Sequence, residues 1–233
     1  MILSIHQPSY FPWLGLLQKI AKSDVYILMD EVQLSDSAYQ NRNLFLTNDG
    51  KVKYLTIPFD RKGYLDKPFC NLDIADDGWR QKHRDFIINN YRKHPGFAEI
   101  IPSLEEFFGC EYLSLCDAVV ASMKLAMELF GIKTKVLLQS QLQYDRSLRK
   151  GDLVIDLIRA AGADVYLSGT GARDYLDESK FGTGIRLEYS VFQHPVYPQR
   201  GGVEFVSGLS CLDMLFNQGL ADARRLFYGA IAP

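Results

Sequence analysis

The sequence predicts an α/β fold, namely a Rossmann-like parallel sheet with a β-hairpin and a helical insertion. Short apolar runs alternate with segments of helical periodicity, and an Asp-Gly pair separates two β-prone runs. Strands that alternate with helices favour a parallel sheet, because two parallel strands need a long crossover between them. The Asp-Gly pair favours a hairpin, since these residues accept the positive φ angles of a tight turn.

The chain opens with a predicted strand, helix and strand. Residues 2–5 form a short apolar run, residues 13–22 carry apolar side chains at helical spacing, and residues 25–29 form a second apolar run. Two prolines and three aromatic residues separate the first run from the helical pattern, and they indicate a turn rather than a helix interior. His6 and Gln7 therefore lie where a strand meets a turn, which is where α/β proteins bind ligands.

The middle of the chain predicts a hairpin followed by helices. Residues 43–47 and 51–57 are the β-prone runs on either side of the Asp-Gly turn. From 78 to 130 the apolar spacing becomes helical, with breaks at Pro-Gly and at a final glycine. We expect one globular unit, in which residues 1–77 and 131–233 form the Rossmann-like core and residues 78–130 form the helical insertion.

The last hundred residues return to alternation. A strand is predicted at 134–138, a helix capped by Asp152, a strand at 164–169, an extended segment at 184–192, and a final helix that begins at Ser210. No internal repeat or long linker interrupts this order. The pattern therefore continues the same α/β layer.

Composition limits the classes of function. The 233 residues are 47% hydrophobic, and the net charge of −2 arises from mixed basic and acidic residues. The lack of a broad basic field argues against nucleic-acid binding. Met1 leads directly into a strand without a secretory-signal pattern, and no apolar run is long enough to span a bilayer. We therefore expect a cytoplasmic protein that does not insert into membranes.

The four cysteines and four histidines do not show the spacing of a metal site. No Cys-x-x-Cys, His-x-x-x-His or His-Glu-x-x-His pattern is present. In a chain without an export signal, free thiols are the expected state of the cysteines. The sequence predicts no structural metal.

Polar or glycine-rich residues follow the strands that the sequence predicts. The first strand ends at His6-Gln7, the second at Asp30, a later one at residues 139–141, and another at Ser168-Gly169. The carboxyl ends of parallel strands lie at one edge of a sheet, so these side chains are candidates for a shared binding site. The turn after residue 168 could contact a phosphate through its backbone N–H groups, or it could be an ordinary tight turn.

Two polar clusters lie outside the strand ends. Asn41, Arg42 and Asn43 precede the hairpin; the guanidinium could clamp a phosphate or carboxylate, while the asparagines orient hydroxyl groups. The alternative is a turn whose asparagines serve the backbone and whose arginine is solvated. Lys150 lies near two arginines in a positive cluster, although on local grounds alone an ordinary surface lysine is the favoured interpretation.

A second segment near the other end of the chain resembles the first turn, because it also combines a histidine, prolines and an aromatic residue. It contains His194, Tyr197 and Gln199. A histidine with a pKa near neutrality suits general acid or base catalysis. We expect one cleft, partly aromatic and partly roofed by the helices of 78–130, with the following lining: His6, Asn41, Arg42, Ser168, His194, Tyr10, Trp13 and Tyr197. If the segment 184–199 ran antiparallel, His194 would lie at the opposite edge.

These motifs resemble the WbqC-like family. The resemblance lies in seven segments, which occur in the same order as in the family: 6–15, 30–33, 41–43, 166–169, 175–176, 194–199 and 208–213. The resemblance therefore covers nearly the whole chain. Glu31 and Tyr39 depart from it, standing where another Asp and a Trp are expected.

The resemblance implies a function in surface-polysaccharide biosynthesis, because members are associated with O-antigen and related gene clusters. It implies a transferase that moves glycine or another small acyl group from its donor onto a nucleotide-linked amino sugar. His6 or His194 would then transfer the proton, and Gln7, Asn41, Arg42 and the Ser168-Gly169 backbone would orient the substrate. The cofactor is unknown, with ATP one candidate, and a homo-oligomer is compatible with this function.

Two other functions stay open. The first turn is loosely similar to that of HIGH-type nucleotide-binding folds, in which His6 and Lys150 or Arg173 would stabilise a transferring phosphate of ATP. The second histidine of that signature and a KMSKS-like loop are missing. In the other alternative, the protein is a non-catalytic subunit of a polysaccharide assembly system. Its contact patch would consist of four exposed aromatic residues, Tyr10, Phe11, Trp13 and Trp79.

Overall fold

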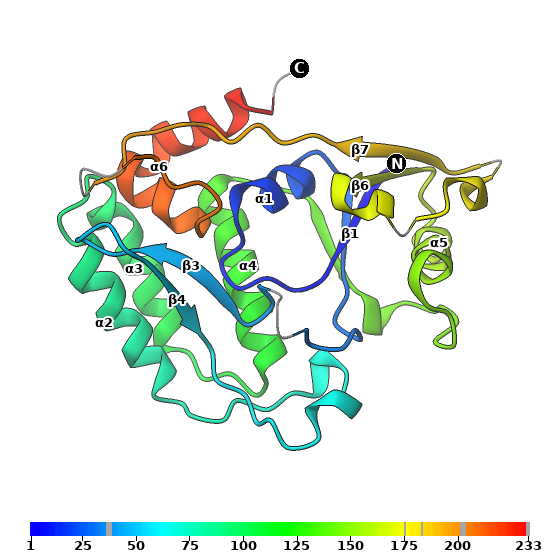
Figure 1. Cartoon of the computed structure of the whole chain (residues 1–233), viewed down its shortest axis with the longest axis horizontal. Helices are drawn as coiled ribbons and strands as arrows, with labels where there is room; N and C mark the ends of the chain where they lie inside the picture. The colour runs from blue at the N-terminus through cyan, green and yellow to red at the C-terminus, as the bar shows by residue number, and fades with distance from the viewer. Residues whose placement is uncertain (36–38, 175, 183, 201–203, 232–233) are drawn as a thin grey trace.

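Five parallel strands form the central sheet of the protein (Figure 1). The computed structural model describes residues 1–35, 39–174, 176–182, 184–200 and 204–231. The strands are β1 (Ile2–His6), β2 (Val25–Leu28), β5 (Lys135–Leu138), β6 (Val165–Gly169) and β7 (Arg186–Ser190), in the spatial order β5-β2-β1-β6-β7. The predicted Rossmann-like α/β class is thereby confirmed, and β7 is parallel to β6.

The order of the strands defines a switch point between β1 and β6. From β1 the chain moves outward to β2 and then β5, and it returns to the other side of β1 to form β6 and β7. Leu3 pairs with Val25 on one side of β1 and with Tyr166 on the other. In open α/β sheets, ligands bind outside the carboxyl ends of the strands at such a reversal. His6 ends β1 and Gly169 ends β6 at this place.

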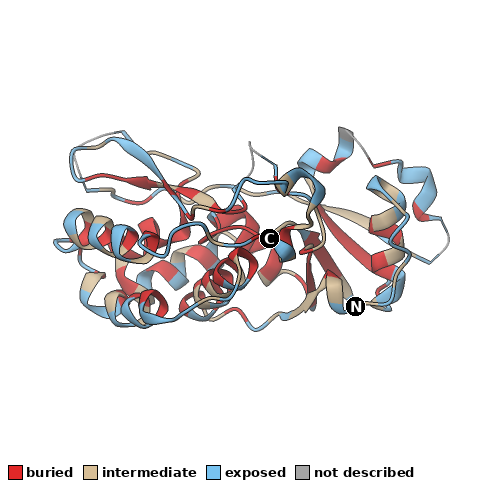
Figure 2. Ribbon diagram, turned by 90° about the horizontal axis from the view of Figure 1, so that it is seen from below, coloured by how far each residue is buried: buried red, intermediate tan, exposed pale blue. Residues whose placement is uncertain are grey.

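Apolar side chains cover both faces of the sheet, as parallel strands require. Leu3 and Ile5 point to one face, where they pack with α5 (Lys150–Ala160) in a smaller core. Tyr26 and Leu28 point to the other face and join a larger core. That core includes residues of α1 (Leu14–Ala21), α4 (Leu115–Phe130) and α6 (Cys211–Gly229). Figure 2 shows buried residues along the central strands and on parts of the surrounding helices.

The hairpin and the middle helices share the larger core. Strands β3 (Arg42–Leu46) and β4 (Val52–Thr56) form a separate antiparallel sheet, and Gly50 in their turn has a φ of 78°. Helices α2 (Trp79–Tyr91) and α3 (Phe97–Gly109) pack beside them. Ser114 caps α4 by accepting the Asp117 N–H at 3.1 Å, and Gly131 ends it with a φ of 71°.

Five short 3₁₀ segments complete the described structure: η1 (Tyr64–Asp66), η2 (Phe69–Asn71), η3 (Gln139–Gln141), η4 (Thr170–Asp174) and η5 (Glu178–Phe181). One predicted boundary is wrong, since Asp152 does not cap α5. The helix begins at Lys150, and the Asp152 carboxylate instead accepts a hydrogen bond from Lys180 at 2.8 Å. Among the described helices, none has the length and apolar character needed to cross a membrane.

Candidate functional site

A cavity of about 1330 Å³ opens at the switch point between β1 and β6. Its walls include the end of β1, helix α1, the turn after β6, the loop around residues 65–68 and the start of α5, together with residues that follow β2, β5 and β7. Six of the predicted site residues line it, namely His6, Gln7, Trp13, Lys150, Ser168 and Gly169. The parallel strands thus bring the first turn and the β6 turn together, as the sequence predicts.

His6 stands at the end of β1 with its ring open to the cavity. Desolvation by the protein around the ring, and secondarily the Lys19 cation, lower the pKa of His6 from 6.5 to about 4. Nδ1 lies 2.9 Å from the Gln7 carbonyl oxygen. A carbonyl only accepts hydrogen bonds, so Nδ1 carries the proton in the neutral ring and Nε2 keeps a lone pair. His6 is therefore a neutral acceptor at pH 7.

Lys19 projects from α1 into the floor of the cavity and is 5% exposed. Its Nζ donates a hydrogen bond of 3.0 Å to the Ile5 carbonyl oxygen. Burial lowers the pKa of Lys19 from 10.5 to about 8. Within the described part of the chain, no carboxylate lies within 4.0 Å of this ammonium. A buried cation without a counter-charge favours an anionic ligand beside it.

Further cations line the cavity: Lys67, Arg146, Arg149 and Lys150. Two carboxylates also line it, those of Glu31 and Asp66, and Glu31 already pairs with Arg146 at 3.1 Å. Lys150 begins α5 with a φ of 53°, an unusual angle for a residue with a side chain. The overall charge of the lining therefore favours an anion.

The turn after β6 leaves open space for a ligand. Ser168 is buried, and Gly169 and Gly171 line the cavity with it. A Cβ atom at either glycine would meet no atom within 4 Å. The space beside both glycines is therefore open.

Trp13 and Phe192 form an aromatic wall of the same cavity. Their rings lie 5.1 Å apart at 90°, and Trp13 is 37% exposed. The benzene part of the indole lies against Gly15 in α1, where an added Cβ would come within 2.2 Å of the ring. Gly15 is therefore required for this placement of Trp13.

Hydrogen-bonded side chains form the opposite wall, at the ends of β2 and β5. Tyr144 donates its hydroxyl proton to Glu31 at 2.6 Å and accepts the Gln139 side-chain amide at 2.8 Å. Asp30 lies behind this wall, because it is 2% exposed and its carboxylate accepts the backbone N–H and the hydroxyl of Ser140. Asp30 was predicted to bind substrate, and the structure instead places it in a hydrogen-bonded support of the loop.

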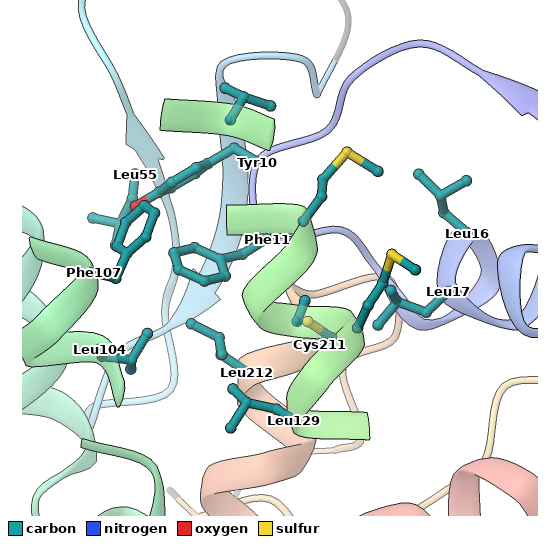
Figure 3. Packing of buried hydrophobic residues seen from close by; sticks show 14 of the residues in the cluster. Tyr10, Phe11, Leu16, Leu17, Leu55, Leu104, Phe107, Leu129, Cys211 and Leu212 are labelled. Atoms are coloured by element: carbon teal, nitrogen blue, oxygen red, sulfur yellow. The ribbon is translucent and has the colours of Figure 1, made fainter. Parts of the chain in front are cut away.

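The first turn is held by residues outside the cavity. Phe11 adopts a φ of 36°; its N–H donates to the Ser122 hydroxyl at 3.1 Å, and its carbonyl accepts from Asn43 at 2.7 Å. Tyr10 is fully buried, and its hydroxyl lies 2.9 Å from His83 Nδ1. Figure 3 shows the Tyr10 and Phe11 rings among core side chains. The prediction that Tyr10 lines the cleft is wrong, because its ring is buried in the core. Asn43 was expected to orient substrate hydroxyl groups, and in the structure it instead holds the backbone of the turn.

The polar cluster before the hairpin does not reach the main cavity either. Asn41 is buried and donates to the Ile57 carbonyl oxygen at 2.9 Å. Arg42 lies with its guanidinium 4.5 Å from the centre of the Tyr54 ring. Both instead line a separate hollow of about 260 Å³. The expectation of one cleft containing these residues is therefore corrected.

The segment at residues 194–199, which contains His194, packs around the buried carboxylate of Asp213. Tyr197 donates to it at 3.0 Å, Gln199 at 2.9 Å and Tyr91 at 3.2 Å. Burial raises the pKa of Asp213, and these three hydrogen bonds oppose that rise. His194 packs behind Phe192, with ring centres 5.4 Å apart, and its Nδ1 lies 2.9 Å from the Pro195 carbonyl oxygen. None of the three predicted residues of this segment lines the cavity.

Two other expectations concern exposed aromatics and the roof of the site. Tyr10 and Phe11 are 0% exposed and Trp79 is 1% exposed, so of the proposed contact patch Trp13 alone is open. The helices of residues 79–130 do not contribute to the cavity lining. Both expectations are therefore wrong.

Sequence reasoning missed Lys19 and Gly15. In the helical pattern Lys19 lies off the apolar stripe and resembles a surface residue, but its long side chain reaches back to the end of β1. The signal that could have found Gly15 is a glycine at the second position of a helix, two residues after an aromatic residue. Among the described residues, no group of three His, Cys, Asp or Glu side chains could hold a metal ion.

Comparisons with known proteins agree with the sequence motifs. The model of the WbqC-like protein family matches residues 7–225. A protein of Mycobacterium tuberculosis (strain ATCC 25618 / H37Rv), described as uncharacterized protein Rv1507c, is 30% identical over 222 residues, which span 93% of this chain and 94% of the relative. No solved structure matches the chain.

Proposed function

The chain belongs to the WbqC-like protein family, and we propose that it is an enzyme that transfers a small acyl or aminoacyl group, of the glycine type, onto a nucleotide-linked amino sugar. Such a step would serve the assembly of surface polysaccharides. The proposed substrates combine a diphosphate, flat and apolar ring surfaces, and an amine that must lose a proton. The cavity at the switch point offers a matching surface to each of these parts.

Lys19 is the observation that carries this proposal. Its ammonium is buried under the cavity at the end of β1, with a carbonyl but no carboxylate as its partner in the described structure. Its burial is costly unless an anion occupies the cavity. A diphosphate placed there would also meet Lys150 and the open turn at Gly169–Gly171. Anion binding at a switch point is the usual arrangement for nucleotides in such sheets.

His6 is proposed as the group that accepts the proton. In the transfer, the amine nitrogen of the sugar attacks the carbonyl carbon of the activated donor, and its proton passes to His6 Nε2. The bond to the donor's leaving group then breaks, and that group departs with the electron pair. The neutral ring of His6 has the required lone pair at pH 7. Gln7, next to His6 in the lining, is proposed to orient the substrate.

A second candidate function is ATP-dependent adenylyl or nucleotidylyl transfer. The specific observation in its favour is His6 at the end of β1, beside the strand reversal at which such folds bind nucleotides. Lys150 lies in the same cavity and could stabilise a transferring phosphate. This function differs from the first in requiring ATP and Mg²⁺.

A single-turnover assay tests the proposal. Excess protein is mixed with a UDP- or dTDP-linked amino sugar and activated glycine, and the sugar product is followed by mass spectrometry. We expect glycyl transfer with the wild type and its loss in His6→Ala, while His194→Ala retains it. Transfer that is equally fast in His6→Ala would contradict the assignment of His6. Adenylated product formed only with ATP and Mg²⁺ would support the second function.

A further inference from the structure

We propose that Trp13 is the stacking platform for the nucleobase of the bound nucleotide. This inference rests on the proposed function, and it assigns one part of the substrate to one wall of the cavity. Of the three aromatic residues in the first turn, Tyr10 and Phe11 are buried at 0% exposure, whereas Trp13 is 37% exposed. Trp13 also lines the cavity, and aromatic side chains in the wall of a cavity are typical of ligand-binding sites.

The protein fixes the orientation of the indole from two sides. Phe192 packs against it at 90° with ring centres 5.1 Å apart. From below, three atoms of the benzene ring lie 2.2–2.7 Å from the position that a Cβ of residue 15 would occupy. A side chain at residue 15 would therefore displace the ring from its present position. Trp13 is thus positioned before any ligand arrives.

The lining of the cavity favours a nucleobase over other flat groups. The cations that would hold phosphates, Lys19 and Lys150, share the cavity with Trp13. A nucleotide presents a flat π surface at one end and phosphates at the other, and it can therefore occupy both surfaces at once. Stacking of a base on tryptophan is strong and tolerates different bases. The face of a sugar ring is the competing occupant, and the test separates the two.

Intrinsic fluorescence reports on this contact directly. The chain has two tryptophans, and Trp79 is 1% exposed in the core, so ligand quenching comes from Trp13. UDP is expected to quench the emission, whereas pyrophosphate and glucosamine 1-phosphate bind without quenching. In Trp13→Phe, Trp79 is the single fluorophore, and UDP should leave its emission unchanged.

Gly15→Ala moves the ring without removing it. We expect this variant to weaken UDP binding at least about fivefold, the loss of one stacked base, while the affinity for pyrophosphate stays the same. Gly109→Ala is the matched control, because a Cβ at Gly109 meets no atom within 4 Å. Circular dichroism of each variant confirms that the fold is retained.

Several results would overturn the platform. If calorimetry shows UDP binding with no change in emission and with full affinity in Trp13→Ala, the base binds elsewhere, although the proposed function survives. Quenching by glucosamine 1-phosphate but not by UDP would assign the wall to a sugar ring. If UDP, pyrophosphate and UDP-linked amino sugars all fail to bind the wild type, the platform and the proposed function both fail.

Discussion

Asn43 donates a hydrogen bond of 2.7 Å to the Phe11 carbonyl oxygen, and this contact ties the hairpin to the turn that follows His6. The same amide also donates to the Tyr10 carbonyl oxygen at 3.1 Å. Phe11 has a φ of 36°, which costs free energy and persists only when its surroundings hold it. Asn43 is therefore a positioning residue for the site.

Asn43→Leu should destabilise the protein by about 1–3 kcal/mol, because two buried carbonyl oxygens lose their donor. The midpoint of urea denaturation measures this change. Lys53→Ala, on the exposed face of the neighbouring strand, is the control and should shift the midpoint little. Nucleotide affinity should fall with Asn43→Leu although Asn43 does not line the cavity. A variant with unchanged stability and lost affinity would instead make Asn43 a direct ligand contact.

Lys19→Met should stabilise the free protein at pH 7 by about 1–3 kcal/mol, because it removes a buried cation that has no carboxylate partner among the described residues. The folded-state pKa of about 8 lies below the ordinary 10.5, so the wild type carries its full penalty below pH 8 and regains stability as pH rises toward 10.5. The same substitution should weaken pyrophosphate binding at least about tenfold. Thermal denaturation and calorimetry on one preparation measure both effects. A destabilised variant with unchanged pyrophosphate affinity would contradict the assignment of Lys19.

The rate of the proposed reaction should have a bell-shaped pH dependence. His6 must be neutral to accept a proton, so kcat/KM should fall as pH drops through about 4. Lys19 must be charged to hold the anion, so kcat/KM should also fall as pH rises through about 8. In Lys19→Met the alkaline limb should disappear from whatever activity remains. An acidic limb near pH 6.5 would show that His6 keeps its ordinary pKa.

The cluster around Asp213 should serve stability and not binding. Tyr197→Phe removes one of the three donors to a buried carboxylate, and we expect it to cost about 1–3 kcal/mol. The affinity for UDP should remain that of the wild type. Chemical denaturation and calorimetry separate these effects. A large loss of UDP affinity with unchanged stability would place Tyr197 in the binding site after all.

The strand pattern predicted the fold because short apolar runs alternate with helical ones over most of the chain. The prediction was least certain for the segment after residue 184, because local sequence does not decide whether a strand there pairs in the parallel or the antiparallel direction. The structure places β7 parallel to β6. The segment that follows leads to the Asp213 cluster and not to the cavity, since His194 lies behind Phe192. Pairing between distant strands is a tertiary property that a single sequence does not specify.

Residues of the cavity lining were predictable where chain geometry alone determines their position. His6, Ser168 and Gly169 end two neighbouring strands, and Trp13 follows in the adjoining turn. Asn41, Asn43, Asp30 and Gln199 were not distinguishable from ligand contacts. Buried carbonyl and N–H groups need the same amide and carboxylate partners that a sugar would use. The hydrogen-bond partner of such a side chain, seen in the structure, tells whether it binds the protein backbone or is free for a ligand.

Isothermal titration of the wild type with a UDP-linked amino sugar, alongside ATP with Mg²⁺, tests the central claim most directly. The account predicts that the nucleotide sugar binds, that pyrophosphate competes with it, and that Lys19→Met weakens it at least about tenfold. Trp79→Phe, a change in the core away from the cavity, should keep the wild-type affinity. Tight binding of ATP with Mg²⁺ and no binding of the nucleotide sugar would contradict the account.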